Sequence, residues 1–173
     1  MKKGFTMIEL IFVIVILGVL ASVAIPRLAA TRDDAEVAKA ATNLTTAVND
    51  LTAYYTAKGS FYSYTKGQDG TYTKGSKISN FTTLTNALDS KGQLIVKGKI
   101  VCAEVVLPDD VTNASDQVKL TVKFKNTDAV CKQLATLQGI KAMCGKTGAN
   151  DTIAADTSTG CQISIGGSSG INF

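Results

Sequence analysis

The most hydrophobic part of the chain lies at its N-terminal end. Residues 5–25 carry a single charged side chain, Glu9, within an apolar run that is followed by Pro26. As an α-helix this run is about 31 Å long, which matches a hydrocarbon core of about 30 Å. Two lysines, Lys2 and Lys3, precede it. The pattern predicts a helix that spans a membrane, with the lysines holding its N-terminal end in the cytoplasm.

A second pattern follows, with the spacing of an amphipathic helix. Apolar positions recur every three or four residues: Val37, Ala41, Leu44, Val48, Leu51 and Tyr55. This spacing places them on one helical face, which we expect to pack against a sheet. Gly59 is a candidate for the left-handed residue that follows a helix. We therefore predict one helix over residues 5–57, bound to the membrane at one end and packed on a domain at the other.

The C-terminal part of the chain has the patterns of strands. They are predicted at residues 93–97, 100–107, 117–125 and 161–165. In the third, apolar residues alternate with lysine and threonine, which is typical of an antiparallel sheet with one face in water. Before the fourth, a helix is predicted to begin at Asp128, a candidate N-cap, and to end by Cys144. The whole pattern predicts an α+β fold, in which the long helix covers the apolar face of an antiparallel sheet.

Residues 60–92 are predicted to be a loop region, because they are rich in turn-forming residues. Gly, Ser and Thr are frequent there, which argues against a long regular element, and one short helix is predicted at residues 82–89. Four aromatic residues lie in the first part of this region: Phe61, Tyr62, Tyr64 and Tyr72. Such rings can stack on carbohydrate or on nucleic-acid bases, but covering the domain core is the favoured interpretation.

Charge and composition narrow the choice of function. The 173 residues contain 18 Lys and Arg against 14 Asp and Glu, a net charge of +4, and no His. Without His, a His-based triad and a His-ligated metal are excluded, and no P-loop or G-x-G-x-x-G motif occurs. The strongest basic feature is a row of lysines on the predicted sheet, Lys119, Lys123 and Lys125, which Lys97 and Lys99 could extend. The row can contact DNA phosphates, but a solvated strand face is the favoured interpretation. We expect no enzyme and no cofactor.

The four cysteines all lie in the C-terminal part: Cys102, Cys131, Cys144 and Cys161. None forms a C-x-x-C pair, so a zinc site is not expected. An even number in a domain beyond a membrane favours two disulfides and an oxidising compartment. Three pairings are possible. We favour Cys131–Cys144, which closes a local loop, together with Cys102–Cys161, which joins two strands.

Glu9 separates the interpretations of the N-terminal segment. A cleaved secretory signal peptide has a shorter apolar stretch, and Pro26 fits poorly after a cleavage site. A plain membrane anchor gives Glu9 no partner, although an acid within a spanning helix costs about 2.5–3.5 kcal/mol on the insertion scale for Asp. No basic residue in the run can supply that partner. We therefore expect the partner of Glu9 to come from elsewhere.

The sequence Lys2-Lys3-Gly4-Phe5-Thr6-Met7-Ile8-Glu9-Leu10 resembles the prepilin signal of type IV pilins and type II secretion pseudopilins. The resemblance implies that a membrane peptidase cuts between Gly4 and Phe5 and methylates the new amino group of Phe5. It implies that Glu9 neutralises the N-terminal amine of a neighbouring subunit during assembly. Gly18 and Pro26 stand at the family's helix-weakening positions, and the stretch between them is expected to lose helicity in a filament.

This resemblance implies a domain organisation. Residues 1–4 are a leader, 5–26 the transmembrane and polymerisation segment, 27–58 the amphipathic half of the helix, and 59–173 a globular domain. The expected location is the bacterial inner membrane, as a single-pass protein with its globular domain in the periplasm. From there the chain enters a pseudopilus or a surface pilus.

The implied function is that of a structural subunit, most simply a type II secretion pseudopilin. The alternatives are a surface type IV pilin for adhesion or motility, and a DNA-uptake competence pseudopilin that binds DNA through the lysine row. Expected partners are further copies of the chain, minor pilins, the prepilin peptidase and membrane lipid. Since major pseudopilins bind calcium in a C-terminal loop, Asn150, Asp151 and Asp156 are weak calcium candidates, with a simple turn as the favoured interpretation.

Overall fold

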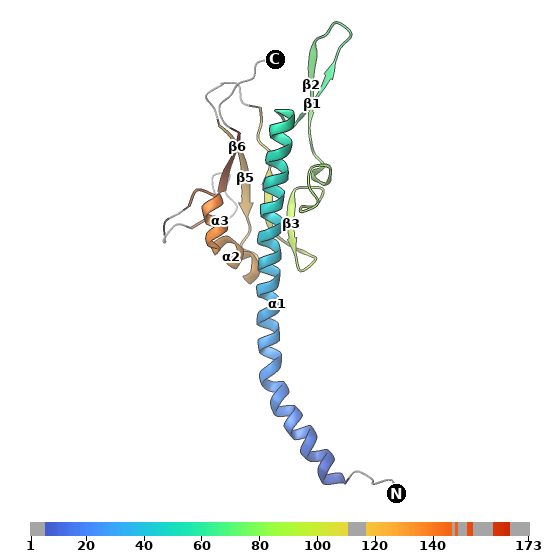
Figure 1. Cartoon of the computed structure of the whole chain (residues 1–173), viewed down its shortest axis with the longest axis vertical. Helices are drawn as coiled ribbons and strands as arrows, with labels where there is room; N and C mark the ends of the chain where they lie inside the picture. Colours follow the sequence, from blue (N-terminus) through green and yellow to red (C-terminus); the bar gives the residue numbers. More distant parts are fainter. Residues whose placement is uncertain (1–5, 111–116, 147, 149–151, 154–160, 167–173) are drawn as a thin grey trace. The chain divides into compact units, whose positions relative to one another are not determined.

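The computed structural model describes residues 6–110, 117–146, 148, 152–153 and 161–166, with the backbone alone at 26 and 28–30 (Figure 1). The chain divides into two compact units, Met1–Ala35 and Glu36–Phe173. In chain order the elements are α1 (Met7–Lys58), β1 (Tyr62–Lys66), β2 (Tyr72–Lys77), the 3₁₀ helix η1 (Phe81–Thr83), β3 (Gln93–Val96), β4 (Ile100–Val106), β5 (Val118–Phe124), α2 (Ala129–Thr136), α3 (Gln138–Met143) and β6 (Cys161–Gly166).

Helix α1 ends where the sequence predicts. Gly59 has a φ of 74°, in the left-handed region, and its N–H donates to the carbonyl of Tyr55 at 2.7 Å. This is the bond of a helix that stops at a left-handed glycine. At the other end, Met7–Ile25 is long and apolar enough to cross a membrane, with a mean hydropathy of 2.9.

The second unit is built on a four-stranded antiparallel sheet in the order β3-β4-β5-β6. In β5 every second residue is buried: Val118, Leu120, Val122 and Phe124. In β4, Ala103 and Val105 pair with Phe124 and Val122, so these four side chains share one face of the sheet. The predicted α+β fold is confirmed.

The second half of α1 supplies the other side of the core. Most of the predicted stripe is buried, with Leu44 and Leu51 at 1% and 0% exposure, while Ala41 and Tyr55 are partly buried against the core. Ala40 and Ala47 are also buried, and the apolar spacing did not single them out. Both alanines belong to the buried core of the second unit.

The prediction for residues 60–92 is wrong in two respects. Strands β1 and β2 form an antiparallel hairpin, because the Tyr- and Thr-rich segments on either side of the Gly67–Gly70 turn have high strand propensity. The short helix predicted at 82–89 is reduced to η1, which Asn80 caps by accepting from the N–H of Thr82. Beyond η1 the N–H of Ala87 donates to the hydroxyl of Thr85 and not to a helical carbonyl, which favours a turn there.

The predicted disulfide pairing is also wrong. Cys102 is bonded to Cys131, and Cys144 to Cys161. The chain passes directly from β5 into α2, and the N–H of Lys125 donates to the carbonyl of Cys102, so the first turns of α2 lie beside β4. That crossing brings Cys131 to Cys102. Cys144, just after α3, is then left to bond the first residue of β6.

The predicted helix from Asp128 is present but divided. Asp128 is the N-cap, and its carboxylate accepts from the N–H of Val130 at 2.9 Å, as the sequence predicts. Leu137 has an extended ψ of 131°, which ends α2 and starts α3 at the next residue. Cys144 directly follows α3, and the second disulfide bonds it to Cys161 at the start of β6.

Candidate functional site

The first turn of α1 contains a reciprocal pair of hydrogen bonds. The N–H and the hydroxyl of Thr6 donate to Oε2 of Glu9 at 2.8 and 2.7 Å, and the N–H of Glu9 lies 3.4 Å from Thr6 Oγ1. This is a capping box, in which side chains satisfy the free donors of a helix start. The carboxylate of Glu9 therefore has a neutral partner, Thr6, within its own chain. The sequence analysis considered only basic partners and did not predict this one. The Thr-x-x-Glu spacing was the signal that could have found it.

The surface of α1 from Met7 to Ile25 is apolar on every side. Its large hydrophobic side chains are between 43% and 79% exposed. The hydroxyl of Ser22 donates to the carbonyl of Val19 at 2.7 Å, so it adds no unsatisfied donor to this surface. A helix that is hydrophobic all round needs lipid or other helices as its cover.

Gly18 has no side chain, so the helix backbone of α1 is accessible at this position of the apolar surface. A Cβ built at Gly18 meets no atom within 4 Å, so neither packing nor backbone conformation within the chain requires glycine there. Small residues allow helices to approach closely in lipid or in a bundle. α1 continues through Pro26, whose side chain is not described, and Gly4 and Phe5 lie outside the described residues.

The lysine row is partly neutralised. Lys123 pairs across the sheet with Glu104, and Nζ of Lys125 lies 3.8 Å from Oε2 of Glu104. Nζ of Lys97 lies 3.4 Å from Oδ1 of Asp128. These acids weaken the field that DNA phosphates require, so the row favours a solvated strand face.

The calcium candidates Asn150, Asp151 and Asp156 lie outside the described residues. Within the part of the chain that the structure describes, no group of three or more His, Cys, Asp or Glu side chains could hold a metal ion. The described residues therefore add no support for a metal centre.

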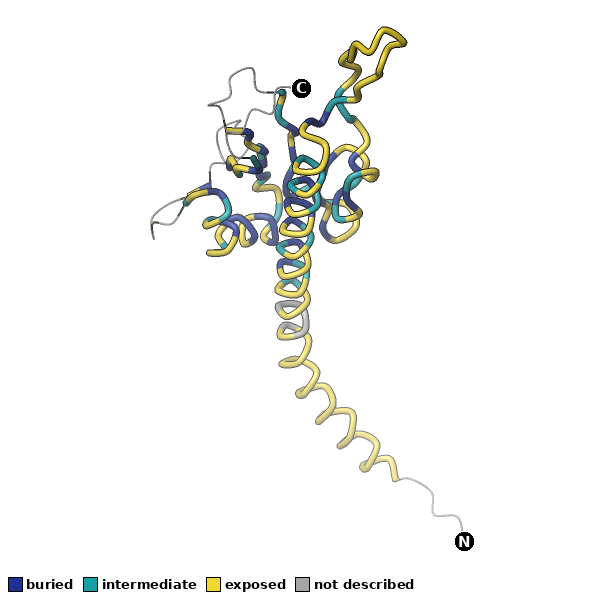
Figure 2. Tube along the Cα trace, turned by 45° about the horizontal axis from the view of Figure 1, so that its top comes forward, coloured by how far each residue is buried: buried dark blue, intermediate teal, exposed yellow. Residues whose placement is uncertain are grey.

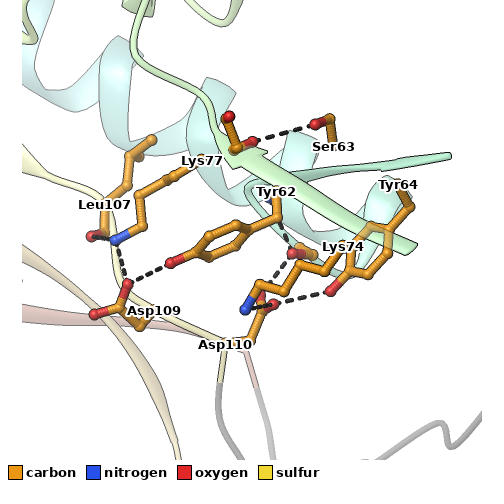
Figure 3. A network of polar contacts seen from close by, with 10 residues as sticks. Tyr62, Ser63, Tyr64, Lys74, Lys77, Leu107, Asp109 and Asp110 are labelled. Atoms are coloured by element: carbon orange, nitrogen blue, oxygen red, sulfur yellow. Dashed lines mark hydrogen bonds and ion pairs between the residues drawn. The ribbon is translucent and has the colours of Figure 1, made fainter. Parts of the chain in front are cut away.

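Two aspartates after β4 hold the β1–β2 hairpin against the rest of the unit, a network that we call the hairpin latch (Figure 3). The hydroxyl of Tyr62 donates to Oδ1 of Asp109 at 2.6 Å. Lys77 forms an ion pair with the same oxygen and also donates to the carbonyl of Leu107 at 3.2 Å. Asp109 thus joins the base of both hairpin strands to the end of β4.

Asp110 forms the second half of the hairpin latch. The hydroxyls of Ser60 and Tyr64 donate to its two carboxylate oxygens at 2.6 and 2.9 Å. Nζ of Lys74 lies 2.7 Å from Oδ2 and 3.7 Å from the centroid of the Tyr62 ring. Sequence reasoning missed this cluster because it joins residues about fifty positions apart, and only their Tyr, Lys and Asp composition hinted at it.

The hairpin latch keeps both carboxyl groups ionised. A hydrogen bond from Lys77 lowers the pKa of Asp109. Burial raises the pKa of Asp110, but hydrogen bonds led by that of Lys74 outweigh it, so the pKa ends below its ordinary value. The bond to Asp109 raises the pKa of Tyr62. Since the carboxyl pKa values are depressed on folding, their contribution is complete above the ordinary Asp value and is lost as the pH falls through the lowered values.

Acidification is therefore expected to open the hairpin before the sheet unfolds. Between pH 7 and about pH 4 the ring resonances of Tyr62 and Tyr64 should stay constant, and below about pH 3.9 they should move toward those of free tyrosine. Two-dimensional NMR of tyrosine-labelled protein in micelles measures this. The variant Asp109→Asn/Asp110→Asn should show the shifted resonances already at pH 7, and unchanged resonances in that variant would contradict the role of the hairpin latch.

A comparison with known protein families finds a match at the N-terminal segment. The family model for the prokaryotic N-terminal methylation motif matches residues 1–25. Comparisons with curated proteins and with solved structures gave no match. The chain therefore carries the N-terminal hallmark of the type IV pilin-like family, as its resemblance predicted, and its α+β composition is consistent with a pilin-like fold. The motif supports a type IV pilin-like subunit.

Proposed function

We propose that this chain is a structural subunit of a filament and, more specifically, a type II secretion pseudopilin. The observation that carries the proposal is the segment Met7–Ile25, which is apolar on all sides and lies within an N-terminal methylation motif. Such a helix has two suitable environments, a lipid bilayer and a bundle of equivalent helices. A subunit that moves from the first to the second polymerises without an exposed apolar intermediate.

The orientation in the membrane follows from charge and from the disulfides. Lys2 and Lys3 keep the N-terminus in the cytoplasm under the positive-inside rule, so the globular unit lies on the other side. The two disulfides are in keeping with this, because such bonds persist in the oxidising periplasm. In this arrangement the membrane peptidase reaches the Gly4–Phe5 bond from the cytoplasmic side.

Glu9 makes the assembly step selective. Lipid tails are as apolar as leucine, so moving the helix from lipid into a bundle gains little hydrophobic energy. In the apolar interior of a filament, the attraction between the Glu9 carboxylate and a neighbouring Phe5 amine is strong. The bonds from Thr6 satisfy the carboxylate until that amine arrives. We infer that Glu9 exchanges this neutral partner for a charged one on assembly.

A deletion strain separates the pseudopilin from the surface pilin. Removing the chain is expected to abolish export of secreted enzymes, which should accumulate in the periplasm, while surface filaments remain unchanged. Secreted and periplasmic fractions are compared by quantitative proteomics, with plasmid-borne wild-type chain as the control. Normal export together with loss of sheared surface filaments would instead assign a surface pilin.

A further inference from the structure

The β1–β2 hairpin presents two exposed tyrosines on one face. In its register Tyr64 pairs with Lys74, and Lys66 pairs with Tyr72, so these side chains lie on the same side of the hairpin. Tyr64 is 47% and Tyr72 65% exposed, whereas the neighbouring Phe61 is 1% exposed. The outer part of the hairpin is exposed throughout (Figure 2). Of the four aromatic residues between positions 61 and 72, only Phe61 belongs to the core.

The two rings are diagonal neighbours on adjacent strands. Such positions lie about 7–8 Å apart, within reach of adjacent units of one polymer. The hydroxyl of Tyr64 is held by Asp110, and Nζ of Lys66 lies 5.7 Å from the centroid of the Tyr72 ring. The hydrogen bond to Asp110 holds the Tyr64 ring before any ligand arrives, which lowers the entropy cost of binding there.

The charges around the rings balance. Three lysines of the hairpin, Lys66, Lys74 and Lys77, are matched by Asp69 in its turn and by the two aspartates of the hairpin latch. Hydrogen bonds from Thr71 lower the pKa of Asp69, so this carboxylate stays charged. A nucleic acid or an acidic polysaccharide would gain little net attraction from such a surface.

We propose that the hairpin face formed by Tyr64 and Tyr72 binds a neutral polysaccharide. An aromatic ring presents a flat apolar surface with a polar tip, which suits the C–H face of a sugar ring. Lys66 and Lys74, beside the rings, carry N–H donors that can bond sugar hydroxyls without requiring an anion. The site lies on the globular unit, so it is independent of the helix that polymerises.

Affinity electrophoresis of the full chain in detergent tests the proposal. The probes are hydroxyethylcellulose, galactomannan and dextran as neutral polymers, with polygalacturonate and oligo(dT) as anionic ones. The wild-type chain should be retarded by at least one neutral polymer and by neither anionic one. Tyr72→Ala should weaken the retardation about tenfold or more, as expected for an aromatic binding residue. Tyr72→Phe, which keeps the ring, should bind like the wild type.

Lys123→Ala, on the sheet, is the matched control and should leave the retardation unchanged. Retardation by polygalacturonate or oligo(dT) instead of the neutral polymers would overturn the proposal, as would no retardation by any of the three neutral polymers. If Tyr72→Ala leaves neutral-polymer binding intact but reduces recovery of the chain in filaments, the face is a contact between subunits and the proposal is wrong. If the wild-type chain assembles into filaments but binds no neutral polymer, the polysaccharide proposal is wrong and the proposed structural role is unaffected.

Discussion

Replacing Glu9 by alanine is expected to abolish filament formation while leaving cleavage at Gly4 intact. The substitution removes the only charge of the apolar run, and with it the attraction for a neighbouring amine. Cleavage should continue because the leader and the bond after Gly4 are unchanged. Shearing the cells and blotting both fractions measures the effect, which should be a loss of sheared chain by at least tenfold.

Two further variants separate the charge of Glu9 from its contact with Thr6. Glu9→Gln keeps a side-chain oxygen that can accept from Thr6 but removes the charge, so it should also fail to assemble. Thr6→Ala removes the cap at a cost of about 0.5–2 kcal/mol but keeps the charge, so filaments should still form. Normal filaments from Glu9→Gln would show that the capping box, and not the charge, is what assembly needs.

Removing the disulfide between Cys102 and Cys131 is expected to lower the free energy of unfolding by about 2–4 kcal/mol. Both cysteines are fully buried, and the bond links α2 to β4 across a sequence separation of 29 residues. The Cys102→Ala/Cys131→Ala variant frees that loop in the unfolded chain and leaves small cavities in the core. Urea unfolding of the full chain in micelles, followed by circular dichroism, measures the difference.

The second disulfide provides the matched control. Cys144 and Cys161 are separated by 17 residues, so the Cys144→Ala/Cys161→Ala variant should lose about 0.5 kcal/mol less from loop closure. Peptide mapping of the unreduced chain should recover Cys102 linked to Cys131. An unchanged midpoint in both double variants, or a recovered Cys131–Cys144 peptide, would contradict this account.

The elements that sequence predicts well are those whose pattern is local and regular. The apolar run and the stripe from Val37 to Leu51 specify α1, because each position follows the last by one helical turn. The alternation in Val118–Phe124 specifies β5 in the same way. In the stripe and in β5, most of the side chains that define the pattern are buried in the core.

The hairpin and the disulfides depend on contacts that local patterns do not encode. Strands β1 and β2 bury almost nothing, so their apolar and polar residues do not alternate as in a core strand. The pairing of Cys131 depends on the crossing of α2 over β4, which no local spacing fixes. The hairpin latch depends on distant contacts too, since only the fold brings Tyr62 and Tyr64 to Asp109 and Asp110.

The N-terminal motif could be predicted from the sequence because it is a local pattern. The family model for the N-terminal methylation motif matches residues 1–25, which include the residues that carry the resemblance to the prepilin signal. The capping box between Thr6 and Glu9 was readable too, since it needs only a separation of three residues. The face formed by Tyr64 and Tyr72 could not be predicted from the sequence, because the two rings share a face only through the register of β1 and β2.

The mass of the N-terminal peptide in sheared and membrane fractions tests the central claim most directly. For the wild-type chain the peptide should begin at Phe5 with a methylated amino group, in both the membrane and the sheared filaments. For Glu9→Ala the same methylated peptide should occur in the membrane fraction alone. A chain that begins at Met1 in every fraction, or one that is cut after residue 25, would contradict a processed filament subunit.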